Sequence, residues 1–376
     1  MYIPAKNSNY RGNPSKNIIA VVHFLAFYLP LVLLGLFWVL RNNTALISSW
    51  VDGCVKPMAK FLATLTDPIP FALGEGALIL LAIFVVVWVG FRVRNCVRKR
   101  HPLFQLFHLK VLVAVVLWVL VWLFWFWNVL YYVPSFAERT GLDIDPYSVD
   151  ELYDTTLTYA KEAAKLSTRV PRDDTLNFDV EQSQYFGSAT TLYLPLEAEF
   201  PFLAMGETST KPLVLSRFQS HFGFSGMYSP YTGEANVNID TPSVLHPVTI
   251  AHEMAHQRSI APEQEANFLA IIACSKSDDV IFRYSGALYG LMQLSSALSS
   301  VSPDLWDTIV AEHFTPEIFI DWNYTVAYWA QFESPVKDAS HQVYDEFLKS
   351  NEQELGMKSY GACVDLLVAY HQQSLT

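Results

Sequence analysis

Three long apolar segments constrain the fold of this chain more than any other feature. They cover residues 17–40, 71–91 and 109–133 and contain almost no charged side chains. An α-helix needs about 20 consecutive apolar residues to cross a bilayer, and helices in the core of a soluble protein are rarely so long and so apolar. We therefore predict three transmembrane helices and a lipid bilayer as a partner. Glu75, in the second segment, is expected to be paired or to reach toward the interface.

The distribution of basic side chains predicts how these helices are oriented. Residues 92–110 contain six Lys and Arg, and residues 1–16 contain three. Short loops rich in Lys and Arg stay in the cytoplasm. The N-terminus and the loop between the second and third segments are thus predicted to be cytoplasmic, and an odd number of crossings places residues 134–376 outside. The first segment is too long for a removable signal peptide and lacks a small-residue cleavage site, so it is predicted to be an anchor.

The balance of charge changes sharply at residue 133. Residues 1–133 contain 12 Lys and Arg and 3 Asp and Glu, whereas residues 134–376 contain 13 and 33. The second part is long enough to bury a core of its own. Its acidic character argues against nucleic acid as a partner, because few side chains are present to neutralise phosphates. We predict a membrane domain over residues 1–133 and an extracytoplasmic domain over residues 134–376.

Local patterns predict an α+β, mostly helical fold for the second domain. Ser148 and Glu151 have the spacing of a capping box, and an amphipathic helix should follow. Residues 189–239 contain short apolar runs separated by turn residues, in which we expect strands within TLYLPL, PLVLSRF and GFSGMYSPYTGEANVNI. Helices are expected from residue 248 onward, at 248–258, 262–275, 280–298 and 360–370.

One of these helices contains the pattern H-E-x-x-H, formed by His252, Glu253 and His256. Four residues make just over one helical turn, so both imidazoles leave the same face and can bind one Zn²⁺ ion. Glu253 then points at the water that completes the zinc coordination, where it can act as a general base. The alternative is an amphipathic helix with two histidines on its polar face.

A zinc ion held by two histidines needs a third protein ligand, and two carboxylates follow closely. Pro262 begins a new helix, and Glu263 and Glu265 lie in its first turn. The run from Glu263 to Asn267 has the spacing E-x-x-A-N and resembles the second active-site helix of the gluzincin metallopeptidases. That resemblance implies Glu263 as the third zinc ligand, with Glu265 facing away toward solvent or a neighbouring Arg or Lys. Glu265 remains the alternative ligand, and two carboxylates that only cap the helix are the second alternative.

Polar groups elsewhere supply further candidates for the site. Glu234, Ala235 and Asn236 begin an alternating run that predicts an edge strand, along which an extended peptide substrate can bind; an ordinary structural edge strand is equally compatible. Asn267 is a candidate to hydrogen-bond a zinc-binding histidine, and Tyr360 to stabilise a transition state. His221, His246 and Tyr228 are weaker candidates for proton transfer. Cys274 and Cys363 would share an oxidising compartment, and the sequence leaves open whether they pair.

The chain as a whole resembles a bacterial family of three-span membrane proteins catalogued as domain of unknown function 3810. The resemblance rests on FSGMYSPYTGEANVNID, HPVTIAHEMAHQRSIAPEQEANFLA and KSYGACVDLLVAYH. It implies a zincin-like extracytoplasmic domain with a gluzincin-like zinc site. Many members have Gly three residues past the second histidine, where this chain has Ser259, so the sequence does not require a left-handed turn there.

The function predicted from these features is that of a membrane-anchored zinc metallopeptidase, with Zn²⁺ as cofactor and a peptide or protein as substrate. The alternative is a non-catalytic sensor or scaffold with a structural zinc site. Such a site would need a fourth protein ligand and would leave Glu253 without a role. The sequence indicates neither the substrate nor the oligomeric state.

Overall fold

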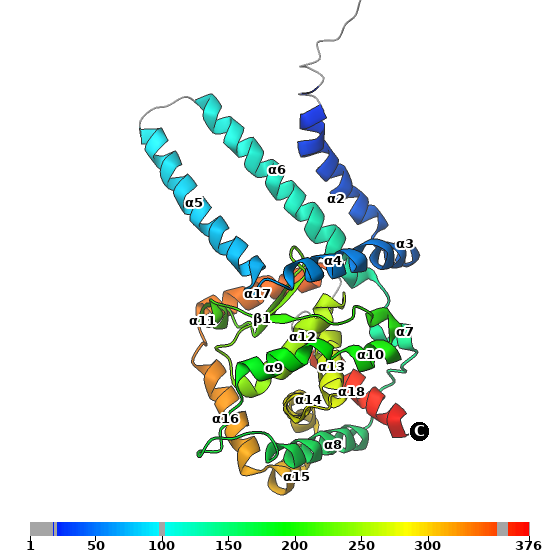
Figure 1. Cartoon of the computed structure of the whole chain (residues 1–376). Helices are drawn as coiled ribbons and strands as arrows, with labels where there is room; N and C mark the ends of the chain where they lie inside the picture. The colour runs from blue at the N-terminus through cyan, green and yellow to red at the C-terminus, as the bar shows by residue number, and fades with distance from the viewer. Residues whose placement is uncertain (1–17, 19–20, 98–101, 352–359, 376) are drawn as a thin grey trace, which may run out of the picture.

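The computed structural model describes residue 18 and residues 21–97, 102–351 and 360–375. Three long helices project from one side of a globular, mostly helical part (Figure 1). The first part contains η1 (Phe24–Tyr28), α2 (Leu29–Leu40), α3 (Thr44–Trp50), η2 (Val51–Val55), α4 (Lys56–Thr66), α5 (Leu73–Val97), α6 (Pro102–Phe126) and η3 (Asn128–Tyr132).

The globular part follows the third long helix. Its helices are α7 (Phe136–Thr140), α8 (Val149–Ser167), α9 (Gln182–Ser188), η4 (Ala189–Thr191), α10 (Leu194–Glu199), η5 (Pro201–Leu203), α11 (Ser216–Ser220), η6 (Ser243–Leu245), α12 (His246–Gln257), α13 (Glu263–Ser275), α14 (Val280–Val301), α15 (Pro303–His313), α16 (Pro316–Ala330), α17 (Pro335–Ser350) and α18 (Tyr360–Leu375). Its strands are β1 (Thr210–Pro212), β2 (Gly226–Ser229) and β3 (Glu234–Val237).

The three predicted apolar segments are helices of the length a bilayer requires. The candidate spans are Val21–Leu40, Leu73–Arg94 and His108–Tyr132. Apolar side chains along them stay uncovered by protein; Val86, for example, is 71% exposed. A soluble protein would bury such a surface, so these helices are consistent with a membrane protein.

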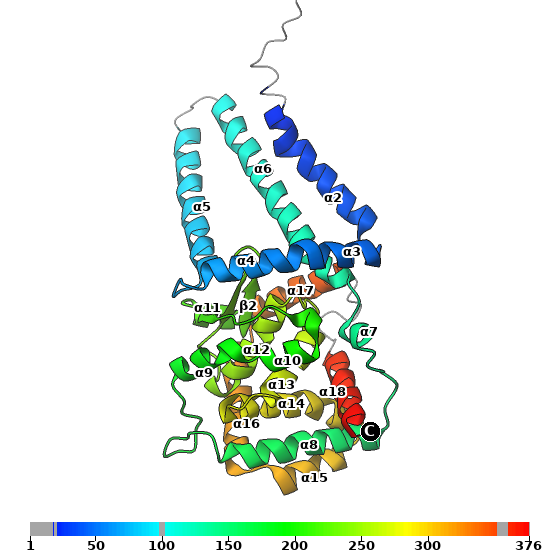
Figure 2. The same ribbon diagram turned by 45° about the vertical axis from the view of Figure 1, so that its right-hand side comes forward.

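A short helical layer separates the long helices from the globular part. The helices α3 and α4 lie across the ends of α2, α5 and α6 (Figure 2). The turn between β2 and β3 reaches α4 at Gly233, which has a φ of 71°. A Cβ atom there would lie 2.6 Å from the backbone nitrogen of Ala63. Only glycine allows both this left-handed backbone and this close approach.

Carboxylates bind the second long helix to the sheet from both sides of the boundary. Glu75 of α5 is buried and accepts hydrogen bonds from the backbone nitrogens of Val214 (2.8 Å) and Leu215 (2.7 Å). In the opposite direction, Glu234 of β3 accepts from the backbone nitrogens of Leu73 (3.0 Å) and Gly74 (2.9 Å) at the start of α5. The expectation that Glu75 is paired is confirmed, with backbone N–H groups as its partners.

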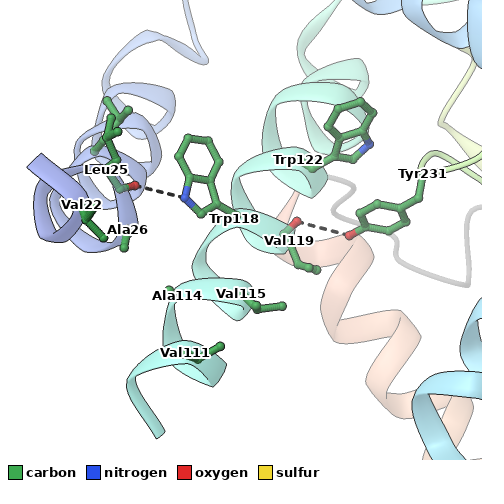
Figure 3. A pocket seen from close by; sticks show the side chains of 11 residues that line it. Val22, Leu25, Ala26, Val111, Ala114, Val115, Trp118, Val119, Trp122 and Tyr231 are labelled. Atoms are coloured by element: carbon green, nitrogen blue, oxygen red, sulfur yellow. Dashed lines mark hydrogen bonds between the residues drawn. The ribbon is translucent and has the colours of Figure 1, made fainter. Parts of the chain in front are cut away.

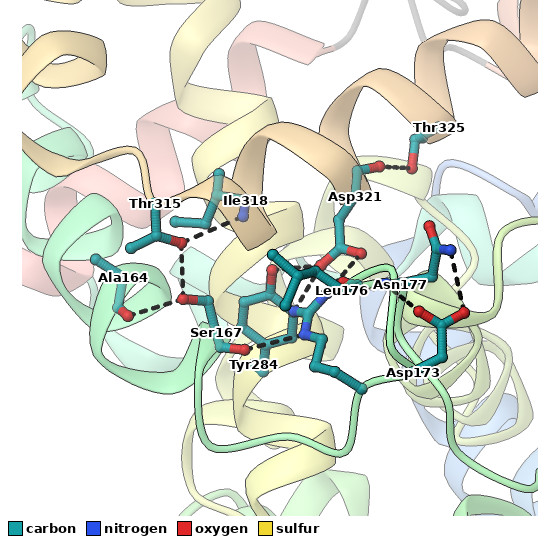
Figure 4. A network of polar contacts seen from close by, with 11 residues as sticks. Ala164, Ser167, Asp173, Leu176, Asn177, Tyr284, Thr315, Ile318, Asp321 and Thr325 are labelled. Carbon is teal, nitrogen blue, oxygen red and sulfur yellow. Dashed lines mark hydrogen bonds and ion pairs between the residues drawn. The ribbon is translucent and has the colours of Figure 1, made fainter.

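The core of the globular part is formed by helices α8, α12, α13, α14 and α18, and apolar side chains fill the space between them. The expected capping box starts α8: the Ser148 side chain accepts from the Glu151 nitrogen, and Glu151 accepts from the Ser148 nitrogen. At the far end, Arg172 and Asp321 form a buried ion pair of two hydrogen bonds, and the Tyr284 hydroxyl donates to the same carboxylate (Figure 4). This network joins α14 and α16 to the loop after α8.

The sheet corrects one prediction about the site. Its strand order is β1-β3-β2, with β1 parallel and β2 antiparallel to β3. The segment containing Glu234, Ala235 and Asn236 is therefore the central strand, and the prediction of an edge strand there is wrong. Ala235, for example, is opposite Thr210 in β1 and Tyr228 in β2. The backbone groups of β3 are directed alternately at β1 and at β2, which leaves no free edge for a peptide.

Two other expected strands are wrong for identifiable reasons. In residues 191–196, the buried Leu192, Tyr193 and Leu196 have helical spacing, and Pro195 is in the first turn of α10, where proline is well tolerated. In residues 212–218, only Pro212 belongs to a strand. The next two backbone nitrogens after Leu213 bind Glu75, so they have no strand partner.

The helices expected at 248–258, 262–275, 280–298 and 360–370 are confirmed as α12, α13, α14 and α18. Helices α15, α16 and α17 had no matching prediction. Cys274 and Cys363 are both buried free thiols. Their burial among apolar side chains accounts for them without a disulfide.

Candidate metal centre

Helix α12 positions the two histidines of the H-E-x-x-H pattern. Pro247 is in its first turn, and Val248, Ile250 and Ala251 are buried against the core. The remaining face turns His252 and His256 toward the same side, and their ring centroids are 4.6 Å apart. The spacing of four residues thus places both imidazoles together, as expected.

Helix α13 brings a carboxylate to the same point. Glu263 is its first residue, and its oxygens lie 3.2 Å from Nε2 of His252 and 3.6 Å from Nε2 of His256. One ligand atom from each of the three side chains lies within 4.8 Å of the others. Two imidazole nitrogens and one carboxylate oxygen thus form a set of donor atoms that could hold a metal ion.

The electrostatics of the cluster couple the three groups. Burial opposes charge on Glu263, but the two imidazoles hold its pKa well below the usual range. Burial also opposes charge on His256, yet the Glu263 carboxylate raises the pKa of His256 to about 9. The same negative carboxylate that attracts a proton to His256 attracts a cation placed between them.

A backbone carbonyl fixes the orientation of His256. Its Nδ1 lies 2.7 Å from the carbonyl oxygen of Ile260, which can only accept, so Nδ1 holds a proton and Nε2 is the nitrogen that faces Glu263. The chain reaches Ile260 through Ser259, which has a φ of 66°. The left-handed turn that the sequence did not require is therefore present, with Ser in a conformation that costs less for Gly.

The two candidate carboxylates differ clearly in position. Glu265 is buried, and its Oε1 accepts a hydrogen bond of 2.9 Å from the backbone nitrogen of Phe136, which begins α7. Burial raises the pKa of Glu265 to about 7. Of the two, Glu263 lies in the cluster, as expected. Of the two surroundings predicted for Glu265, solvent is wrong, because this side chain caps another helix inside the protein, whereas a neighbouring basic side chain is present in Arg139.

Glu253 lies directly beside the cluster and faces β2. Its side chain is buried, and its Oε2 has no hydrogen-bond partner among the described residues. Burial raises the pKa of Glu253 to about 7, despite the neighbouring imidazoles. Gly226 of β2 lies so close that a Cβ atom there would be 2.3 Å from Oε1 of Glu253. A buried carboxylate oxygen without a partner is unusual, and it marks this group as available to a ligand.

Aromatic side chains that no local pattern indicated complete the surroundings. The Tyr344 hydroxyl of α17 donates a hydrogen bond to Oε1 of Glu263. Trp127, just after α6, packs edge-on against His256 with ring centroids 5.6 Å apart, and its ring lies 5.3 Å from that of Tyr228. The end of the third long helix therefore forms one wall of the cluster.

The described contacts of Asn267 and His246 are with residues other than the three clustered side chains. The Asn267 side chain accepts a hydrogen bond of 3.1 Å from the Tyr289 hydroxyl, so its described contact is with a tyrosine and not with a histidine of the cluster. His246 is buried, with Tyr185 on Nδ1 and the Thr241 carbonyl on Nε2, which is a structural arrangement. The side chain of Tyr360 lies outside the described residues.

His221 and the start of β3 also have other partners. The ring of His221 packs against Phe332, with centroids 5.0 Å apart. Glu234 forms a buried ion pair of 2.7 Å with Lys211, and the amide of Asn236 donates to the carbonyl of Met227. These side chains hold the sheet together.

Fold and site define a mostly helical chain with three candidate membrane spans, a small sheet and a His-His-Glu cluster on two consecutive helices. The family described as "Protein of unknown function (DUF3810)" matches residues 50–368. The chain belongs to this family. No curated protein and no solved structure matches it.

Proposed function

We propose that the protein is a zinc-dependent metallopeptidase held in a membrane by its three long helices. The observation that carries this proposal is the convergence of His252, His256 and Glu263 beside a buried carboxylate, Glu253, that has an unpartnered oxygen. A purely structural zinc site would be closed by a fourth protein ligand. Among the described residues the cluster has three, and Glu253 stands next to the open side.

The residues divide the work of peptide hydrolysis between them. His252, His256 and Glu263 would hold Zn²⁺, which supplies Lewis-acid chemistry by lowering the pKa of a water molecule and polarising the scissile carbonyl. Glu253 takes a proton from a water molecule while the oxygen of this water bonds to the carbonyl carbon. The C–N bond then breaks, and Glu253 passes the proton to the leaving nitrogen. The Tyr344 hydroxyl donates to Glu263, and in the proposed mechanism it would turn to donate a hydrogen bond to the carbonyl oxygen.

The outer edge of β2 is the path that we propose for the substrate, in place of β3. The Asn238 nitrogen donates to the Ser225 carbonyl at 2.9 Å, which makes these two residues a hydrogen-bonded pair. Because bonding alternates along an antiparallel ladder, the N–H and C=O groups of Gly226 and Tyr228 are directed away from β3. No other strand of the described residues pairs with this edge. An extended peptide can add there and pass directly beside Glu253.

The proposed location is the cell membrane, with the cluster on its outer face. Two features support it: the candidate spans are largely uncovered by protein, and basic residues concentrate between α5 and α6, at the end of these helices that is far from the globular part (Figure 1). The N-terminus would be cytoplasmic. The substrate would be an extracytoplasmic peptide or protein, and nucleic acid is not an expected partner.

The experiment that tests this function uses matched substitutions in the full-length protein purified in detergent. Glu263→Gln should lose zinc at a chelator concentration that leaves Glu265→Gln loaded, since only Glu263 lies in the cluster and the Gln at 265 can still accept from Phe136. Glu253→Gln should keep zinc but lose peptide hydrolysis by about 10²- to 10⁴-fold. Zinc is measured by elemental analysis, and hydrolysis with a mixed peptide library read by mass spectrometry.

Three results would contradict the proposal. Loss of zinc from Glu265→Gln at a lower chelator concentration than from Glu263→Gln would show that Glu265, and not Glu263, is the third ligand. Loss of zinc together with activity in Glu253→Gln would make Glu253 a ligand and the site structural. A zinc-loaded wild-type protein that cleaves no peptide would remove the peptidase function itself.

A further inference from the structure

An apolar groove runs between two of the long helices. One wall is formed by Val22, just before η1, with Leu25 of η1 and Leu29 of α2, and the other by the α6 residues from Val111 to Trp122 (Figure 3). It has a volume of about 790 Å³ and only apolar and aromatic side chains in its lining, with Tyr231 of the β2–β3 turn at one end. A water-filled groove would present polar groups, so this one accepts an apolar occupant.

We propose that this groove holds the acyl chain of a lipid-anchored peptide, which is the substrate of the proposed peptidase. The groove lies between proposed membrane spans, where the only occupants are lipid-soluble. From Val111 to Trp122 the helix rises by about 16 Å at 1.5 Å per residue. An extended hydrocarbon chain is much narrower than a helix, which is about 10 to 12 Å wide, and it can lie along this length between the two walls.

The groove is continuous with the path to the cluster. The Tyr231 hydroxyl donates to the Val119 carbonyl of α6 at 3.3 Å, and the Trp122 indole donates to the Pro230 carbonyl at 2.9 Å. These bonds hold the end of β2 against the groove. Tyr231 is five positions after Gly226, which lies against Glu253. The strand from Gly226 to Ser229 covers roughly 10 Å at about 3.3 Å per residue and the turn completes the path to Tyr231, so an extended peptide covers the distance with at most about five residues.

The direction of β2 decides which end of the substrate bears the acyl chain. The strand runs from Gly226, at the cluster, to Ser229, near the long helices. A peptide that pairs antiparallel, the more stable arrangement, runs from the groove toward the cluster. Its N-terminal end therefore lies at the membrane. Water adds to the carbonyl carbon about five residues from that end, the C–N bond breaks, and the proton passes to the released amine. One product keeps the lipid and a new carboxylate, and the other is a soluble peptide.

The test reconstitutes the full-length protein in phosphatidylcholine vesicles with one mixed-sequence peptide library in four forms. The forms are unanchored, N-palmitoylated, C-terminally palmitoylated and fused to a transmembrane helix. We expect the N-palmitoylated form to be cleaved at least tenfold faster than the unanchored form, and the lipid-bearing product to keep about five residues. Ala114→Trp, or Ala26→Trp from the opposite wall, fills the groove and should abolish that advantage. Val86→Trp adds the same ring on the exposed surface of α5 and should leave it intact.

Each alternative outcome has a distinct meaning. Equal cleavage of the unanchored peptide, or an advantage that survives both groove variants, overturns the acyl site while the peptidase function stands. Preference for the C-terminal anchor or for the transmembrane helix overturns the assigned direction or occupant. A second readout does not depend on hydrolysis: in Glu253→Gln, an N-palmitoyl peptide with a diazirine on its acyl chain should crosslink to η1, α2 and α6, and Ala114→Trp should prevent it. Absence of this crosslink overturns the inference, whereas crosslinking without any hydrolysis in the wild type refutes only the peptidase.

Discussion

The substitution Gly226→Ala should disturb the proposed chemistry of the site while leaving the fold intact. The added Cβ atom would lie 2.3 Å from Oε1, 2.7 Å from Cδ and 2.8 Å from Cγ of Glu253. Ordinary contacts between heavy atoms are about 3.5 to 4.0 Å, so the carboxylate must move by about 1 Å. Because the atoms in conflict are the end of a flexible side chain, the Glu253 side chain can yield while the backbone stays in place.

The expected effect on stability is small, and that on activity is large. An off-rotamer side chain destabilises the folded state by about 0.5 to 1.5 kcal/mol, whereas replacing Gly by Ala within a strand stabilises it by about 0.5 to 1 kcal/mol. The free energy of unfolding should therefore change by less than about 1 kcal/mol. A 1 Å displacement of a catalytic group can lower the rate by about 100-fold. Zinc should remain bound, since the three atoms nearest to the added Cβ atom all belong to Glu253 and none to a proposed ligand.

The assay measures three quantities on the same detergent-purified protein: bound zinc, the melting temperature and the hydrolysis of a peptide library. Gly187→Ala is the matched control, because nothing lies within 4 Å of the Cβ atom it adds. Retention of at least half of the wild-type rate by a folded, zinc-loaded Gly226→Ala protein would refute the role of Glu253 as general base. Loss of zinc from the variant would show instead that β2 supports the ligands.

Two further predictions concern stability. His246 is buried in its neutral form with its pKa lowered to about 4, whereas a free histidine has a pKa near 6.5. As pH falls, the unfolded state therefore binds the proton first, and stability is lost between about pH 6.5 and 4. The melting temperature of His246→Gln should be lower than that of the wild type at pH 7 but should decline less between pH 7 and 5, and a decline as steep as that of the wild type would contradict this. Asp321→Ala should lower the free energy of unfolding by about 3 to 5 kcal/mol, because Arg172 is left buried without its partner, and Arg172→Leu in the same chain should restore part of the loss in urea unfolding. A double variant less stable than Asp321→Ala alone would show that the pair is not the cause.

The parts of the fold that could be predicted are those set by local sequence. The apolar length of the three spans and the Ser148–Glu151 capping box are properties of short windows, and the structure confirms both. The strand expected after Pro212 failed because of a distant residue. Glu75, about 140 positions earlier in the chain, binds the backbone nitrogens that a neighbouring strand would have used. Tertiary contacts of this kind override local propensity.

In the candidate site too, some residues could be predicted from local sequence, whereas others are brought in by tertiary contacts. His252, His256 and Glu263 span only 12 residues, so helical geometry and one short turn are enough to bring them together. Tyr344 comes from 81 positions further along the chain, and Trp127 from the end of a predicted membrane span. Neither has a sequence pattern that distinguishes it from an ordinary aromatic residue of a helix.

The position of the cluster relative to the long helices follows from a short series of contacts. Gln257, the last residue of α12, donates a hydrogen bond of 2.8 Å to the Gly233 carbonyl, and Gly233 packs on α4. One residue further, Glu234 receives the first backbone N–H groups of α5. The helix that bears both histidines is thus bonded to the same turn that fixes the long helices. In the proposed membrane-bound peptidase, such a site would have a constant height above the bilayer and would select its scissile bond by distance from the lipid anchor as well as by sequence.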